Sequence, residues 1–125
     1  MNSKDMAILA ARSMDAKKGS KITVLKLEDL TVITDYFVVG TGNSRAQTQA
    51  LAEAVSEALE AAGQNVLRTE GFQEGRWILL DFGTVIVHIF QEDERSFYNL
   101  ERLWSDAPAL PHDEVFPEGS ADQDR

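Results

Sequence analysis

The chain has 125 residues, no cysteine and a formal net charge of −9. This length supports one domain with its own apolar core, and the lack of cysteine excludes disulfides and thiolate metal sites. No apolar run approaches membrane-spanning length, and the first residues show neither a signal segment nor a transit segment. We therefore expect a cytoplasmic protein.

The negative charge is unevenly distributed. Residues 106–125 contain six acidic side chains and one basic side chain, a net charge of −5, which leaves −4 for the first 105 residues. Such a chain is a poor direct binder of nucleic acid, because phosphate contacts need Lys and Arg. It suits a basic protein partner, although solubility alone also explains this charge.

Apolar periodicity predicts the first elements. A helix over 3–18 is expected to end at Gly19. Strands follow over 21–27 and 35–41, and the second is the more apolar and so the more central. Between them, residues 32–33 are expected to pack back on the core.

A strand–helix–strand unit comes next. Asn43 or Ser44 caps a long helix that Gly63 ends, and residues 64–70 form a strand before a polar loop. Such a crossover implies parallel pairing between the strands on either side of the helix.

Two β-branched runs around Gly83 predict a hairpin. A three-residue loop over 81–83 keeps the bulky Phe82 out of positive φ and gives that conformation to Gly83. This register places Trp77 and Leu79 on one face, and a one-residue slip would exchange the faces. The side chains expected beside them are Val85, Val87 and Ile89.

Residues 95–104 return to helical spacing, and the acidic, proline-containing segment 106–125 is expected to be a disordered tail. The domain therefore spans 1–105. The order of elements predicts an α/β fold, a mixed five-stranded sheet covered by helices.

Few residues suggest chemistry. The turn Gly40–Ser44 precedes a helix N-terminus, where anions can bind, but a tight capped turn explains it too. His88 and His112 lie far apart without cysteine partners, so we expect no metal site. Asp81 has no second carboxylate for metal-dependent nucleotidyl transfer. We expect no cofactor and no enzymatic activity.

Trp77 and Tyr98 are large amphipathic aromatic residues, a type that is enriched at interface hot spots. Trp77 begins a strand beside a polar loop, and Tyr98 lies next to the apolar stripe of the last helix. Each fits either the core or a contact surface. His88 within an apolar strand fits a core or interface position.

Four ordered motifs give the chain a resemblance to the Iojap family of ribosomal silencing factors over about residues 4–105. They are Leu30–Val39, Gly42–Ser44 before the long helix, Glu70–Gly71 with the hairpin 77–88, and Arg95–Trp104. Two positions depart from the family pattern. Ala46 stands where the family has Arg, and Thr84 stands where it has Asp.

The resemblance implies a nucleotidyltransferase-like fold without the catalytic carboxylate pair. It also implies binding to protein fourteen of the large ribosomal subunit, a steric block of subunit joining, and repression of translation when nutrients are scarce. A role in large-subunit assembly and a homodimer of the free protein are further implications. The alternative is residual nucleotide binding or transfer at Gly40–Ser44. The expected contact residues are Trp77, Ile78, Leu79, His88, Arg95, Tyr98 and Glu101.

Overall fold

The computed structural model describes residues 1–94, 102 and 105–117. In chain order the elements are α1 (Ser3–Ala16), β1 (Ser20–Lys26), β2 (Tyr36–Gly42), α2 (Arg45–Ala61), β3 (Arg68–Glu70), β4 (Trp77–Asp81), β5 (Val85–Gln91) and α5 (His112–Val115). The helix predicted over 95–104 lies outside the described residues.

The five strands form one mixed sheet in the order β1-β2-β5-β4-β3. β2 and β5 pair in parallel, and the other neighbours pair antiparallel. The predicted α/β class with a mixed five-stranded sheet is confirmed. The predicted parallel pairing across α2 is only partly right, because β2 and β3 run in the same direction but the β4–β5 hairpin lies between them.

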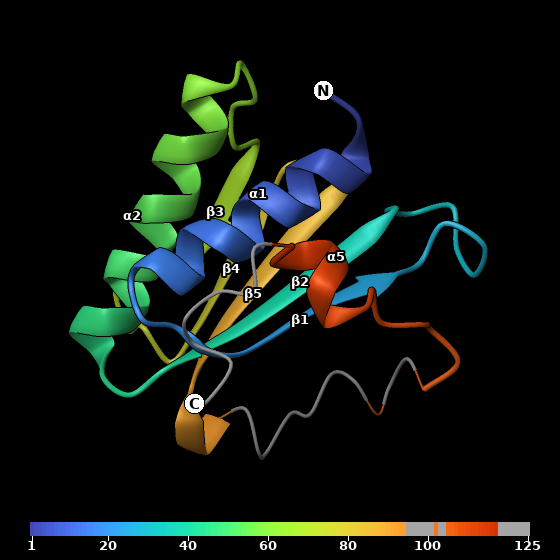
Figure 1. Ribbon diagram of the computed structural model, residues 1–125. Helices are drawn as coiled ribbons and strands as arrows, with labels where there is room; N and C mark the ends of the chain where they lie inside the picture. Colours follow the sequence, from blue (N-terminus) through green and yellow to red (C-terminus); the bar gives the residue numbers. More distant parts are fainter. Residues whose placement is uncertain (95–101, 103–104, 118–125) are drawn as a thin grey trace.

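Both long helices pack on the same face of the sheet (Figure 1). The strand side chains that point toward α1 and α2 form the main core, and they are almost fully buried. On the helices, the buried positions recur at the spacing of one helical face, which is why two amphipathic helices suffice to cover the sheet. The fully buried strand residues on this face include Val38, Ile78, Leu80, Val87 and Ile89.

The two helices end in the same way with different residues. In α2, Gly63 adopts φ +87°, and the N–H of Gln64 donates to the carbonyl of Leu59, as predicted for a glycine stop. In α1 the left-handed residue is Lys18, at φ +67°, and not Gly19. Gly19 is needed for close packing instead, because a Cβ there would lie 3.1 Å from the carbonyl oxygen of Met14.

The hairpin register differs from the prediction by three residues, an odd number, so Trp77 and Leu79 do not share a face with Val85, Val87 and Ile89. Trp77 pairs with Phe90, and Leu79 pairs with His88. The loop contains two residues, Gly83 and Thr84, closed by the Phe82 N–H, which donates to the carbonyl of Val85 at 2.9 Å. Gly83 has φ +89°, the conformation that the first position of such a loop requires. The carboxylate of Asp81 accepts from the Gly83 N–H at 2.8 Å and fixes the turn.

The segment before β2 also differs from the prediction. Val32 is fully exposed and Ile33 is 77% exposed, so this pair does not pack back on the core. The chain turns at 28–31 through backbone hydrogen bonds from Leu30 and Thr31 to the carbonyl of Leu27. Leu27 is the side chain that is buried here.

The acidic segment does not behave as a disordered tail over 106–117. The N–H of Lys26 donates to the carbonyl of Pro108, and the N–H of Leu110 donates to the carbonyl of Val24, so this segment lies along the outer edge of β1. It then crosses to the helix-covered face, where Val115 and Phe116 are buried. We call residues 105–117 the strap. The remaining tail, 118–125, lies outside the described residues.

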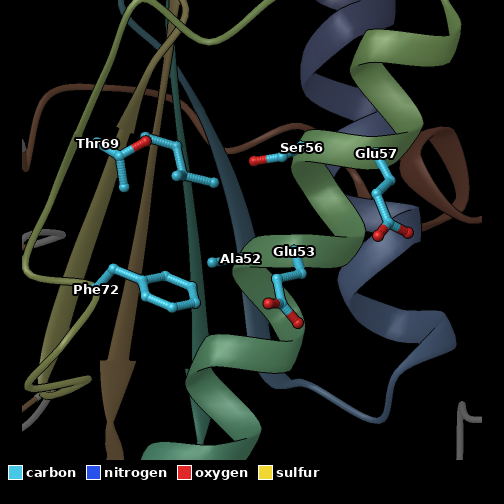
Figure 2. Close-up of a pocket in the computed structure, with 7 residues that line it drawn as sticks. Ala52, Glu53, Ser56, Glu57, Thr69 and Phe72 are labelled. Atoms are coloured by element: carbon cyan, nitrogen blue, oxygen red, sulfur yellow. The ribbon is translucent and has the colours of Figure 1, made fainter.

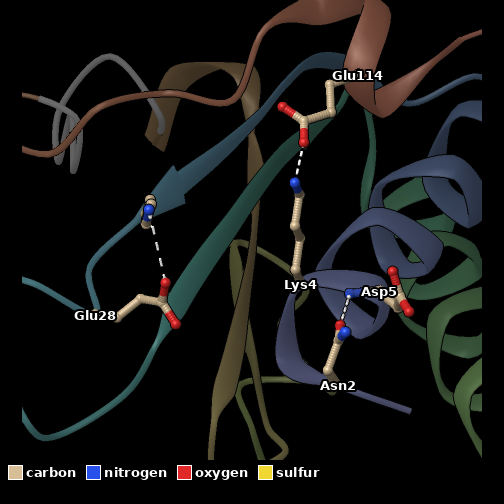
Figure 3. Close-up of polar contacts among 6 residues, drawn as sticks. Asn2, Lys4, Asp5, Glu28 and Glu114 are labelled. Carbon is tan, nitrogen blue, oxygen red and sulfur yellow. Dashed lines mark hydrogen bonds and ion pairs between the residues drawn. The ribbon is translucent and has the colours of Figure 1, made fainter.

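An ion pair ties the strap to the start of the chain. Lys4 of α1 contacts Glu114 of α5, and beside it the Asn2 side chain caps α1 by accepting from the Asp5 N–H at 2.7 Å (Figure 3). Both members of the ion pair are partly exposed, so it contributes little free energy. The strap is held chiefly by its two buried apolar side chains.

The burial of Phe116 makes the strap part of the folding unit. We expect Phe116→Ala to lower the free energy of unfolding by about 3 kcal/mol, because truncation of a buried Phe leaves a cavity. Urea unfolding followed by circular dichroism measures the difference. Asp113→Ala, an exposed change in the same short helix, is the matched control and should stay within about 0.5 kcal/mol of the parent. Equal midpoints for the parent and Phe116→Ala would show that the strap does not contribute to stability.

Candidate partner-binding face

The other face of the sheet carries aromatic and apolar side chains from three strands. We call the strand residues that point away from α1 and α2 the aromatic face. Their positions follow from the register, in which His88 lies between Val39 on one side and Leu79 on the other. Val39, His88 and Phe90 are buried, and the others are partly exposed. The aromatic face comprises Phe37, Val39, Trp77, Leu79, Ile86, His88 and Phe90.

Trp77 and His88 form the polar contact at the centre of this face. The indole N–H of Trp77 donates to Nδ1 of His88 at 3.0 Å. The Trp77 ring also packs on Phe90, with ring centroids 5.1 Å apart, and Phe37 meets His88 edge-on at 4.7 Å. The half-buried indole is therefore held in one orientation before any partner arrives, which lowers the entropic cost of using it as an anchor.

Burial controls the charge of His88. It lowers the pKa of the imidazole from 6.5 to about 4, so the side chain is neutral at physiological pH. Since Nδ1 accepts from Trp77, the proton of the neutral ring resides on Nε2. Nε2 is buried and has no hydrogen-bond partner among the described residues. A protonated His88 could not accept from the indole, so acid removes this contact.

The loop before β4 positions Trp77 from the backbone side. Gly71 has φ +77°, and a Cβ there would lie 2.1 Å from the carbonyl oxygen of Trp77. At the other end of the loop, the carbonyl of Gly75 accepts from the Thr48 hydroxyl at 2.7 Å and from the Gln91 side chain at 3.1 Å. These contacts join the loop to α2 and to β5, so the start of β4 has little freedom to move.

The structure brings three of the predicted contact residues together and separates one. Trp77, Leu79 and His88 share the aromatic face. Ile78 points to the opposite face, where it is fully buried under the helices, so a partner cannot reach it. Sequence reasoning missed Phe37 and Phe90, although the alternation of side chains along β2 and β5 places them here once the register is known. Arg95, Tyr98 and Glu101 lie outside the described residues.

The turn at Gly40–Ser44 has a structural explanation. The Ser44 side chain accepts from the Gln47 N–H at 3.1 Å, and the Gln47 side chain accepts from the Asn43 N–H at 2.7 Å, a reciprocal N-terminal cap. A Cβ on Gly40 would lie 2.7 Å from the Met14 sulfur. The capping role expected of Ser44 is confirmed, and the need for glycine at position 40 arises from helix packing.

The comparisons with known proteins agree on one family. The profile described as "Ribosomal silencing factor during starvation" matches residues 1–125. The chain belongs to this family. Its members are named as ribosomal silencing factors, and the resemblance seen in the sequence motifs is confirmed.

Individual relatives show the same likeness. The chain is similar to ribosomal silencing factor RsfS of Bacillus subtilis, with 44% identity over 108 residues, 86% of this chain and 92% of that protein. A crystal structure of a Chromobacterium violaceum protein superimposes with a TM-score of 0.82 at 34% identity, covering 84% of this chain and 88% of the other. A mouse protein named "Mitochondrial assembly of ribosomal large subunit protein 1" is 28% identical over 104 residues, 81% of this chain and 44% of its own length.

Two further observations concern other kinds of site. Within residues 1–94, 102 and 105–117, no three His, Asp or Glu side chains gather in a way that could hold a metal ion. In the same part of the chain, every helix is too short or too polar to cross a membrane.

The neutral His88 makes stability depend on pH. Its folded pKa lies below its unfolded pKa, so the unfolded chain binds the extra proton, and stability present above pH 6.5 is lost as the pH falls toward 4. We expect protonation of this group to lower the free energy of unfolding by about 2 kcal/mol between pH 7.5 and pH 5. Urea unfolding at both pH values measures the loss.

The matched variant is His88→Gln, which offers the indole an acceptor but does not titrate. Acidic side chains contribute equally to the parent and the variant, so the difference between them isolates His88. The variant should lose about 2 kcal/mol less than the parent over this range. The same loss in both proteins would mean that His88 is not held neutral by burial.

Proposed function

We propose that this protein binds protein fourteen of the large ribosomal subunit through the aromatic face and sterically blocks joining of the small subunit. The effect is to repress translation under nutrient limitation. The supporting observation is the partly exposed Trp77, held by His88 and Phe90 beside the partly exposed Leu79. A rigid aromatic anchor with apolar neighbours is what protein interface hot spots contain. On this proposal Arg95, Tyr98 and Glu101 complete the contact surface.

Charge and chemistry support a binding role over catalysis. A net charge of −9 disfavours direct contact with RNA phosphates and favours a basic protein. The side chains that first suggested chemistry have structural tasks, since Asp81 fixes the hairpin turn and Ser44 caps α2. A steric block needs no reaction, so the proposed protein is not an enzyme and uses no cofactor.

Family membership supports three extensions of this proposal. The name of the mouse relative supports a role in assembly of the large subunit in addition to silencing. We also propose a cytoplasmic location, where a ribosome-binding protein would meet its partner. When no large subunit is available, we propose that the free protein pairs with a second copy of itself.

The aromatic face can be tested by adding a charge of the same sign as the basic partner. We expect Leu79→Arg to weaken binding to isolated protein fourteen about thirtyfold, the loss of roughly 2 kcal/mol that is typical of a hot spot. Trp77→Ala should weaken it to a similar degree. Isothermal titration calorimetry measures both, and urea unfolding of each variant shows that it remains folded at the titration temperature.

Val32→Arg is the matched control. It makes the same kind of change at a fully exposed position in the loop before β2. This loop leads into the Tyr36 end of β2, whereas Trp77 is in line with Thr41 near the other end. This variant should bind like the parent. If Val32→Arg weakens binding as much as Leu79→Arg, or if folded Leu79→Arg binds normally, the aromatic face is not the contact surface.

The steric block is a separate claim with its own measurement. Separated small and large subunits are mixed with and without the protein, and sucrose-gradient sedimentation measures the fraction that associates. We expect a stoichiometric excess of the protein to reduce the associated fraction and to sediment with the large subunit. The protein carrying Leu79→Arg should do neither. If the protein binds the large subunit but does not reduce association of the two subunits, the proposed steric block is wrong and the proposed contact still stands.

A further inference from the structure

A cavity opens on the helix-covered side of the molecule, between α2 and the edge of the sheet (Figure 2). It encloses about 220 Å³. Its floor and walls are largely apolar, and in Figure 2 Phe72 and Thr69 face Ala52 and Ser56 across it. The lining residues are Ala52, Glu53, Ser56, Glu57, Thr69, Phe72 and Leu80.

The walls of this cavity are held in place. The side-chain amide of Gln49 on α2 donates to the carbonyl of Phe72 at 2.7 Å and to that of Gln73 at 3.3 Å. The same loop is fixed at Gly75, as described above. Leu80 belongs to the core, and Ala52 is fully buried in α2. The cavity therefore exists in the folded protein without rearrangement, which favours binding.

The rim of the cavity is acidic. Glu53 and Glu57 lie one turn apart on α2, and among the described residues neither forms an ion pair. Like charges at this spacing repel. Helix stability does not account for this arrangement. A cation bound between the two carboxylates would remove the repulsion.

The nearest strand leaves room for a partner. β3 is the edge of the sheet, and no strand pairs with its outer side in the part of the chain that is described. Its arginine, Arg68, does not neutralise the rim, because it reaches Glu70 at 3.2 Å and Asp81 at 3.8 Å on the other face of the sheet. An extended segment can lie along β3 with one side chain directed into the cavity beside Thr69.

We propose that this cavity binds a lysine or arginine side chain of a protein partner, presented by an extended basic segment along β3. The aliphatic stem of such a side chain packs on Phe72 and Leu80, while its charged head reaches the carboxylates of Glu53 and Glu57. A stem of this length suits the cavity, and the charge of the rim selects a cation. The same carboxylates repel nucleic acid, which makes a basic protein segment the fitting occupant.

This site is independent of the proposed function. Thr69 and Leu80 pair on the helix-covered face, whereas Trp77 and Leu79 point to the opposite face. A segment bound in the cavity would leave the aromatic face free, so the two contacts can be made together. Linking two contacts in this way raises the overall affinity without any new interaction at either.

A short synthetic peptide tests the site directly. The probe is the acetylated, amidated pentapeptide Thr-Val-Lys-Val-Thr, and its controls carry norleucine or glutamate at the centre. We expect the lysine peptide to shift the backbone amide resonances of Ala52, Ser56, Thr69 and Phe72 saturably, with a Kd of about 1 mM. The norleucine peptide should bind at least about tenfold more weakly, and the glutamate peptide should not bind.

Charge-matched variants separate the site from general attraction to an acidic protein. In the protein carrying Glu53→Gln and Glu57→Gln, binding of the lysine peptide should weaken about tenfold or more. The control carries Asp29→Asn and Glu60→Gln, which remove the same charge from exposed positions outside the cavity, and it should bind like the parent. Equal weakening in both variants, shifts centred elsewhere, or no saturable shift up to about 10 mM overturns the proposal.

Discussion

The two-residue loop at Gly83 and Thr84 sets the faces of the whole sheet. Because side chains alternate along a strand, the number of residues in this turn decides which residues of β4 share a face with which residues of β5. Since β5 pairs with β2 in a fixed parallel register, each β2 side chain shares a face with its β5 partner. Had the loop contained three residues, 82–84, Trp77 would pair with Ile89 under the helices and Ile78 would pair with His88 on the other face. This loop therefore determines both which β4 side chains enter the core and which lie on the aromatic face.

Several features of the fold follow from local sequence signals. Ser44 and Gly63 mark the ends of α2 because a capping side chain and a left-handed residue have few substitutes. The mixed sheet follows from one helical crossover and one hairpin. The hairpin register was not predictable, because residues 77–80 are all apolar. Alternation identifies the buried face only where one face is polar, and both faces of β4 pack against other side chains.

The strap and the loop before β2 show a different limit of sequence reasoning. Residues 106–125 are acidic on average, but two adjacent apolar residues, Val115 and Phe116, suffice to anchor the first half. In the loop, Val32 and Ile33 look like core residues and are exposed, whereas Leu27 is buried. Composition averages over a segment, whereas packing is decided one side chain at a time. Of the expected contact residues that the structure describes, Ile78 is the one that lies under the helices, and the register places it there.

The strap also has a consequence for folding during synthesis. Ala109 bridges to Leu25, so the outer edge of β1 gains its neighbour only after 84 further residues have been made. Until then a newly made chain presents an unpaired strand edge and an open site where Phe116 will pack. Contacts this distant in sequence form late, since loop closure must precede them. The nascent protein thus completes its core only after Phe116 has been made, and a chaperone that shields β1 would protect it in the interval.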